Sequence, residues 1–151
     1  MKSSLGVKGL QEIDNQLAAL PKATSKAVMR RALKKELEPV ASTANFFWPG
    51  ADDTAFAVSS RLKQGQRAQS ASVGAVTMYV GATRSAPHAH LLEFGTEPRF
   101  HKSGKGVGAV SPTPILLPSW DSHKDEILAG LAKTLREELQ ATIRRRASRG
   151  L

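Results

Sequence analysis

The sequence contains no cysteine, few aromatic residues and no long run of apolar residues. The lack of cysteine excludes disulfide bonds, thiolate metal sites and cysteine nucleophiles. No apolar run approaches the roughly 20 residues of a membrane-spanning helix, and the opening MKSSLGVKGLQE lacks the apolar core of a secretory signal. We therefore expect a soluble chain that is not exported and is stabilised by packing or assembly.

The remaining composition is that of an ordinary folded protein. Of the 151 residues, 40% are hydrophobic and 23% are charged, which is close to the average for globular domains. A chain of this length is expected to form one hydrophobic core. The sequence thus predicts a single domain over residues 1–151.

The net charge of +9 is concentrated at the two ends of the chain. Residues 1–40 carry 8 basic and 4 acidic groups, residues 41–132 carry 8 and 7, and residues 133–151 carry 6 and 2. A basic surface attracts polyanions by neutralising their charge and releasing counterions. The charge is therefore compatible with three classes of binding partner, namely nucleic acid, an anionic membrane surface and an acidic protein, and it does not distinguish among them.

The N-terminal part has the apolar spacing of amphipathic helices. One apolar stripe ends at Pro21, and it consists of Leu10, Ile13, Leu17 and Leu20. A second stripe follows, with most basic residues away from it, and it consists of Val28, Ala32, Leu37, Val40 and Ala44. Pro39 is expected to kink the second helix or to begin its last turn.

An aromatic cluster and a change of period follow the helices. Phe46, Phe47 and Trp48 precede a Pro-Gly turn, and we expect them to cover a sheet edge or a neighbouring chain. Apolar residues alternate over residues 76–80, which indicates a strand, and the stretch from Leu62 to Ser72 gives a weaker indication of another. We expect an antiparallel pair whose polar tip spans residues 64–74.

The last third combines a glycine- and proline-rich segment with a long helix. Residues 100–118 read as a loop that becomes ordered when a partner docks. The helix is predicted to begin near Ser119 or Ser122, with a stripe of Trp120, Ile127, Leu131, Leu135 and Leu139. Residues 144–151 read as a flexible basic tail. The fold class is therefore α+β, with an N-terminal amphipathic helix, a small antiparallel sheet and a long C-terminal helix.

Few residues have the spacing of a reactive site. His88, His90 and Glu93 are metal-ligand types, and His101 lies nearby, but they lack the spacing of a fixed ligand pair. The adjacent pairs Asp52 and Asp53, and Glu137 and Glu138, are expected to be solvated. We predict no catalytic residues, no metal and no cofactor. An enzyme that uses His88, His90 and Glu93 remains the weakest alternative.

The basic C-terminal end is a candidate for phosphate contacts. Arg144, Arg145, Arg146 and Arg149 could neutralise phosphates, as could the basic N-terminal helix. No aromatic residue within these two stretches could stack on bases, and no DNA-binding motif spacing is present. A small, basic, non-specific nucleic-acid-binding module is therefore the main alternative function.

Three motifs in a fixed order carry a family resemblance. They are HAHLLEFGTEPR at residues 88–99, GLQEIDNQLAALP at residues 9–21 with KAVMRRALKK at residues 26–35, and the proline-flanked approach to the last helix at residues 114–120. Together they resemble the tail-completion (tail-component) family of long-tailed phages, which are proteins of the head–tail neck. Between the prolines, this chain has Ile115, Leu116 and Leu117 where the family commonly shows an aromatic residue and an arginine.

The resemblance implies a structural function rather than turnover. It implies a ring, which in this family commonly has six copies, between the head-closure protein and the tail terminator or tail tube protein, with genomic DNA passing through the centre and bound non-specifically at most. It places the protein in the virion, at a neck assembled in the bacterial cytoplasm, with no membrane partner. We expect Glu93 to bond backbone or an arginine, Phe94 to anchor the core and Gly95 to end a short element. The residues predicted to contact other subunits or partners are Phe46, Phe47, Trp48, Glu93, Phe94, Gly95, Thr96, Gly104, Lys105, Gly106 and Trp120.

Overall fold

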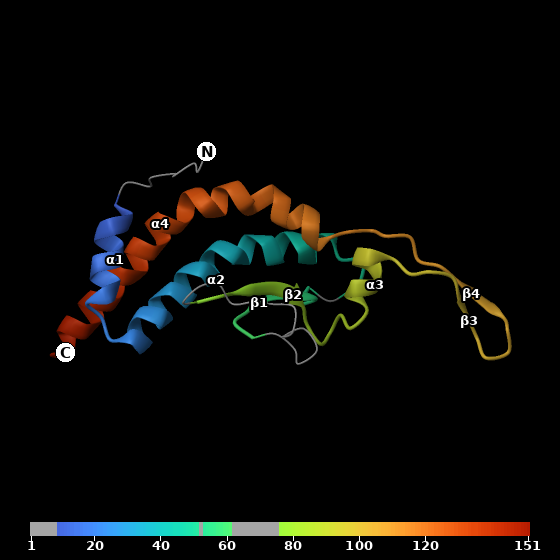
Figure 1. The fold of residues 1–151 in the computed structure, drawn as a ribbon, viewed down its shortest axis with the longest axis horizontal. Coiled ribbons are helices and arrows are strands. Elements are labelled where there is room, and N and C mark those ends of the chain that lie inside the picture. Colours follow the sequence, from blue (N-terminus) through green and yellow to red (C-terminus); the bar gives the residue numbers. More distant parts are fainter. Residues whose placement is uncertain (1–8, 52, 62–75) are drawn as a thin grey trace. The chain divides into compact units, whose positions relative to one another are not determined.

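A computed structural model describes residues 9–51, 53–61 and 76–151. The elements, in chain order, are α1 (Leu10–Ala18), α2 (Lys22–Phe47), β1 (Phe56–Ser59), β2 (Tyr79–Ala82), α3 (Ala89–Phe94), β3 (Arg99–Phe100), β4 (Gly106–Gly108) and α4 (Leu116–Ser148) (Figure 1). Strand β1 pairs with β2, and β3 pairs with β4 in an antiparallel hairpin. The α+β class, with N-terminal helices, a small antiparallel sheet and a long C-terminal helix, is confirmed.

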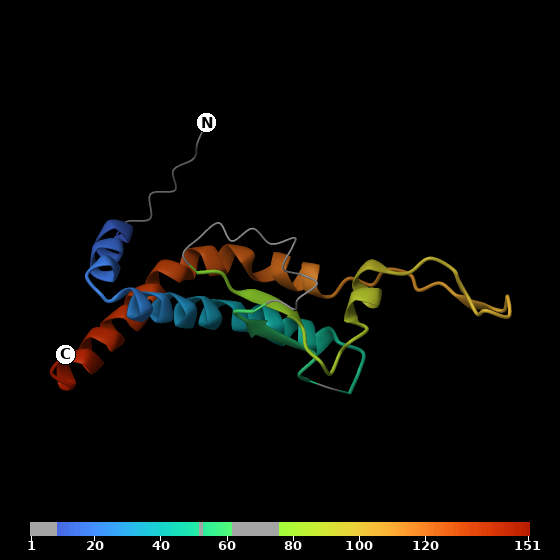
Figure 2. The same ribbon diagram turned by 60° about the horizontal axis from the view of Figure 1, so that its bottom comes forward.

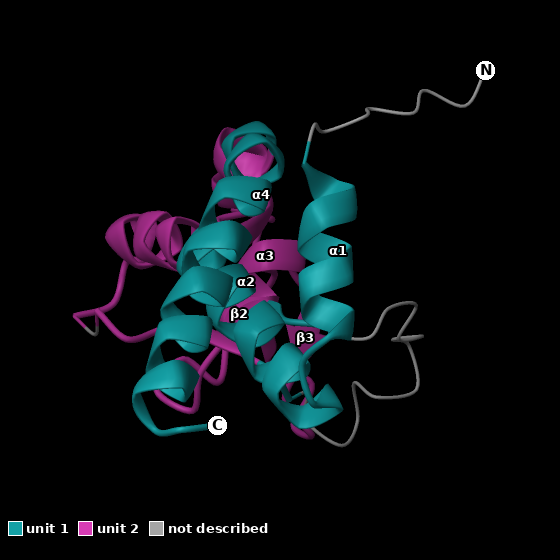
Figure 3. Ribbon diagram, turned by 90° about the vertical axis from the view of Figure 1, so that its left-hand side faces the viewer, with its two compact units in different colours: residues 1–37, 60–79, 125–151 teal, residues 38–59, 80–124 magenta. Residues whose placement is uncertain are grey.

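The chain divides into two compact units, and the single domain over residues 1–151 stays a prediction. Unit 1 comprises residues 1–37, 60–79 and 125–151, and unit 2 comprises residues 38–59 and 80–124 (Figure 3). Each unit is built from segments that are distant in the sequence.

The core of unit 1 is formed by the apolar stripes of three helices. Its buried residues are Ile13, Leu17, Val28 and Leu139, and Leu20, Met29 and Leu135 pack against them. Burial of a Leu, Ile or Val side chain stabilises a fold by roughly 1.5–3 kcal/mol. The predicted stripes of α1, α2 and α4 are therefore confirmed for these members, while Leu10, 44% exposed, lies outside the core.

A polar network lies beside that core. The Glu138 carboxylate accepts a hydrogen bond from Nε of Arg31 at 2.9 Å and pairs with Nζ of Lys35 at 2.5 Å. Arg31 also donates through Nη2 to Oγ1 of Thr142 at 2.8 Å. The Lys35 ammonium and then the Arg31 guanidinium hold the pKa of Glu138 below its ordinary value, against the opposite effect of burial. The expectation that Glu138 is solvated is wrong, because its position on the inner side of α4 places it between these cations.

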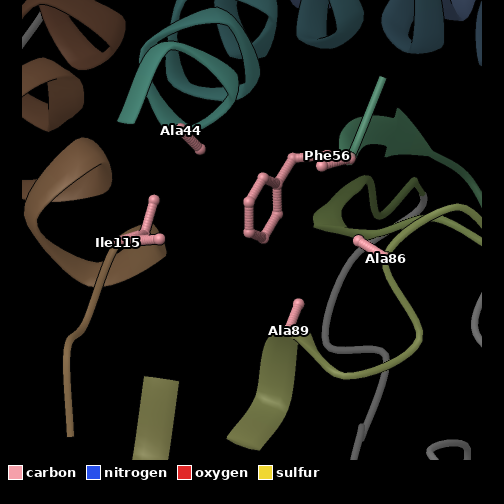
Figure 4. Packing of buried hydrophobic residues seen from close by; sticks show 6 residues of the cluster. Ala44, Phe56, Ala86, Ala89 and Ile115 are labelled. Atoms are coloured by element: carbon pink, nitrogen blue, oxygen red, sulfur yellow. The ribbon is translucent and has the colours of Figure 1, made fainter. Parts of the chain in front are cut away.

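The core of unit 2 is built mainly from small residues around one phenylalanine. Phe56 of β1 lies among Ala44, Ala55, Ala86, Ala89 and Ile115 (Figure 4). Trp48 and Leu116 pack against this cluster, and the Trp48 and Phe56 rings meet edge to face with centroids 5.7 Å apart. The prediction that the aromatic triplet covers the sheet is thus confirmed for Trp48.

The Asn45 side chain acts as a pairing partner for the first residue of β1. Its Nδ2 donates to the carbonyl of Phe56 at 2.9 Å, and its Oδ1 accepts from the N–H of Phe56 at 2.7 Å. Both backbone polar groups of this buried residue are thereby satisfied. The link joins the end of α2 to the sheet of unit 2.

Several element boundaries differ from the sequence predictions. Strand β2 begins at Tyr79, not Val76, and the strand expected near Leu62 and the tip at residues 64–74 lie outside the described residues. Helix α2 continues past Pro39 to Phe47, so the proline does not begin its last turn. Helix α4 begins earlier than predicted, at Leu116, and it includes most of the basic end, up to Ser148.

Candidate functional site

Glu93, at the end of α3, caps the beginning of α4. Its carboxylate accepts backbone N–H groups from Ile115 at 2.8 Å, Leu116 at 3.0 Å and Leu117 at 3.0 Å. The first N–H groups of a helix have no partner within the helix, and negative charge at that end is favourable. A side chain 22 residues upstream therefore fixes where the long helix starts.

These hydrogen bonds also determine the ionisation of Glu93. Partial burial acts to raise the pKa of its carboxyl, but the three backbone N–H groups outweigh that effect and lower the pKa below its ordinary value. The carboxylate is charged at neutral pH and fully engaged. The expectation that Glu93 bonds neighbouring backbone is confirmed, and its partners make it a structural group rather than a free ligand.

Gly95 and Thr96, which follow shortly after Glu93, contact the backbone of Val110. Gly95 has a φ of 72° and a ψ of −177°, and a Cβ placed there would lie 2.8 Å from the Val110 carbonyl oxygen. The N–H of Thr96 donates to that carbonyl at 2.8 Å, and its Oγ1 accepts from the N–H of Val110 at 3.0 Å. Only glycine fits the backbone conformation and the close approach together. We call Glu93, Gly95 and Thr96 the elbow.

Phe94 points out of the elbow instead of anchoring the core. It is 79% exposed, so the prediction of a core anchor is wrong. The reason is that Ala89, which is buried, and Glu93, which caps α4, are four positions apart and share one face of α3, whereas Phe94 follows about 100° further round the helix and points away from that face. Its exposure leaves Phe94 available for contact with another chain.

Exposed phenylalanine is a general property of unit 2. Of the five phenylalanines in the sequence, four are largely exposed: Phe46 at 81%, Phe47 at 61%, Phe94 at 79% and Phe100 at 69%. Phe46 and Phe47 contact each other edge to face, with ring centroids 5.2 Å apart. Trp120, on α4, is 41% exposed. Phenylalanine is among the residues most often buried, so four exposed phenylalanines in one unit are unusual, and they are the candidate interface of this unit.

The glycine-rich segment predicted as a loop contains the β3–β4 hairpin. Arg99 lies opposite Gly108, and Phe100 lies opposite Gly106. The N–H of His101 donates to the Lys105 carbonyl at 2.9 Å, and Gly104 adopts a φ of 80° in the turn. The candidate interface residues Gly104, Lys105 and Gly106 thus occupy the tip and returning strand of a hairpin.

The histidines and the C-terminal arginines are not gathered into a reactive site. His88, His90 and His101 are exposed, and no group of three metal-ligating side chains exists among the residues that the structure describes. Within the same residues, no helix is both long enough and apolar enough to cross a bilayer. Arg144, Arg145 and Arg149 are exposed at the end of α4, while Arg146 is half-buried. Arg145 donates to the Ala141 carbonyl at 3.2 Å.

Sequence reasoning missed the hydrogen-bond partners of the elbow and the polar network of unit 1. Val110 and Ile115 carry no pattern that would identify them as partners of Thr96 and Glu93. The proline-rich approach to α4 was the only available indication, since it shows that the helix must start nearby. Comparison with known proteins returns no match: neither a family model, nor a curated protein, nor a solved structure corresponds to the chain.

Proposed function

We propose that this protein is a structural subunit of a phage neck, which assembles into a ring between the head-closure protein and the tail terminator or tail tube protein. The observation that carries the proposal is the exposure of four of the five phenylalanines, all in unit 2. Such side chains are stabilised when another chain covers them. A closed ring needs two different complementary surfaces on each subunit, which suits a chain with several exposed patches.

The chemistry of the elbow supports the same proposal. Within the segment that resembles the tail-completion family, Glu93, Gly95 and Thr96 hold backbone in place and Phe94 is presented outward. The segment therefore builds and displays a surface. No step in this arrangement requires a substrate, a metal or a cofactor.

The proposal is tested on particles and on the purified full-length chain. Immunogold labelling should place the protein at the junction of head and tail, and negative-stain microscopy of concentrated protein should show rings. F46A/F47A should remain folded by circular dichroism and should form fewer rings, whereas A57C, at an exposed position on β1, should leave assembly unchanged. Label elsewhere on the particle, or no label, would contradict the neck assignment.

A second candidate function is non-specific nucleic-acid binding, and the distribution of charge favours it. The segments of unit 1 carry 17 Lys and Arg residues against 7 Asp and Glu, whereas those of unit 2 carry 5 against 6. In a neck, we expect these cations to face solvent or acidic partners, because a strong grip on phosphates would slow the passage of DNA. Binding whose logarithm falls steeply with the logarithm of salt, and which R144A/R145A/R146A abolishes, would favour the second function.

A further inference from the structure

The β3–β4 hairpin has no cover within its own unit. We call residues 99–108 the arm; every one of them is exposed, as are the flanking residues 97, 98 and 109. In both views the arm extends away from α3 (Figures 1 and 2). A two-stranded hairpin by itself is marginally stable in water, so a partner surface would stabilise it.

The arm offers a defined chemistry to that partner. Phe100 and Val107 are 69% and 54% exposed, and the Phe100 ring lies beside Gly106. The arm carries three cations, Arg99, Lys102 and Lys105, and no acidic residue. Its partner should therefore combine apolar area with negative charge.

The rest of unit 2 has the opposite charge. Outside the arm, its segments carry six Asp and Glu residues and two Lys and Arg. The arm and the remainder of the same unit are thus complementary in charge. Two copies of the chain could associate head to tail, with the arm of one on the unit 2 of the next, and contacts of that kind close into rings.

The first turns of α4 provide the matching surface. Leu117, Trp120 and Asp121 share one helical face, because they are separated by three and four positions. Leu117 is 59% exposed, Trp120 is 41% exposed, and the Asp121 side chain is 52% exposed. Asp121 pairs with Lys124 at 2.9 Å, an exposed pair of the kind that contributes little and can exchange partners. The face thus combines two apolar side chains with a carboxylate whose exposed pair with Lys124 a cation of the arm can replace, while Phe100 and Val107 cover the apolar part.

We propose that the arm of one copy docks on the Leu117, Trp120 and Asp121 face of a second copy. The inference rests on the proposed assembly of the chain and specifies the contact that would link its subunits. The arm supplies Phe100 and Val107 to the apolar part of the contact, and Lys102 or Lys105 faces Asp121.

The absence of cysteine permits a direct test on the full-length chain. V107C and L117C are purified separately, mixed and treated with a short bis-maleimide, so that a mixed dimer can form only between copies. The mixed V107C–L117C product should exceed the product of V107C with A57C at least about tenfold. Adding K105E to the V107C protein should lower the yield, and adding D121K to the L117C protein should restore it. D53K is the matched control, because Asp53 is also an exposed acid of unit 2.

The following outcomes of the cross-linking experiment overturn the docking proposal. Equal yields for L117C and A57C would exclude the α4 face, and a monomeric chain at all concentrations would exclude a second copy as the partner. If the V107C–L117C product does not exceed the A57C control and K102E/K105E abolishes a gel shift with DNA, the arm contacts nucleic acid instead of a second copy. The neck assignment is judged separately by immunogold labelling. Label at the neck with no cross-link would reject only the arm contact, and a cross-link without neck label would reject only the assignment.

Discussion

Replacing Glu93 by glutamine should destabilise unit 2 by removing the charge that caps α4. The glutamine amide keeps the shape of the side chain, but only one of its two terminal atoms can accept, so at least one of the three N–H groups loses its partner. Loss of a cap and of hydrogen bonds to a charged group should cost about 1–2 kcal/mol for E93Q and about 2–3 kcal/mol for E93A.

Urea denaturation followed by tryptophan fluorescence measures this effect in the relevant unit, because Trp48 and Trp120 both belong to unit 2. With a typical dependence on urea, the midpoint of E93Q should fall by about 0.5–1 M. E97Q is the matched control, since Glu97 is exposed four positions away, and it should change the free energy of unfolding by less than about 0.5 kcal/mol. Hydrogen exchange at Ile115, Leu116 and Leu117 should accelerate in E93Q only.

The effect should also depend on pH in a defined direction. The folded state lowers the pKa of Glu93 below its ordinary value of 4.5, so its contribution is complete above that value and is lost as the pH falls through the lowered pKa. Wild-type protein should therefore lose more stability than E93Q on acidification below about pH 5. If E93Q matches wild type in both midpoint and acid dependence, the carboxylate does not hold the helix in solution.

Three further substitutions test other parts of the fold. G95A should lower the free energy of unfolding by at least about 2 kcal/mol, and G108A should lower it by less. Both glycines have a positive φ, but only at Gly95 would a Cβ meet neighbouring backbone. Equal urea midpoints for the two variants would refute the close approach at Gly95. E138A should lower the free energy of unfolding by about 1–2 kcal/mol, because Arg31 and Lys35 lose their shared carboxylate but are 40% and 62% exposed and can be solvated. E137A, at the exposed neighbour, should lower it by less than about 0.5 kcal/mol. N45D keeps the acceptor that serves β1 and loses the donor, so thermal denaturation should rank it between wild type and N45A.

Helical periodicity identified much of the fold in advance. The burial of Val28 and Ala32 was predicted correctly, because residues four positions apart share one face of a helix. Leu37 is also buried, but it lies on another side of α2, so the predicted residues do not form a single stripe. Phe56 was missed, because a four-residue strand between small residues leaves no extended alternating pattern.

The elbow could be predicted only in part. The sequence indicated that Glu93 bonds backbone or an arginine, and that Gly95 ends a short element, which is a local property. The partners of Glu93 lie 22 residues away, and nothing in the intervening segment specifies that separation. The prediction for Phe94 was wrong for the same reason, because the direction of its side chain depends on how the contact between Glu93 and α4 orients α3.

The contacts of the elbow also make the hairpin between Thr96 and Val110 structurally independent of the helix that follows it. Thr96 is joined to Val110, and Glu93 to Ile115, so the entry and exit of the hairpin are held at one place whatever lies beyond them. Longer or shorter hairpins could be inserted there at a modest entropic cost, without moving the start of the long helix. Selection could therefore vary the reach and specificity of the appendage while the body that carries it stays the same.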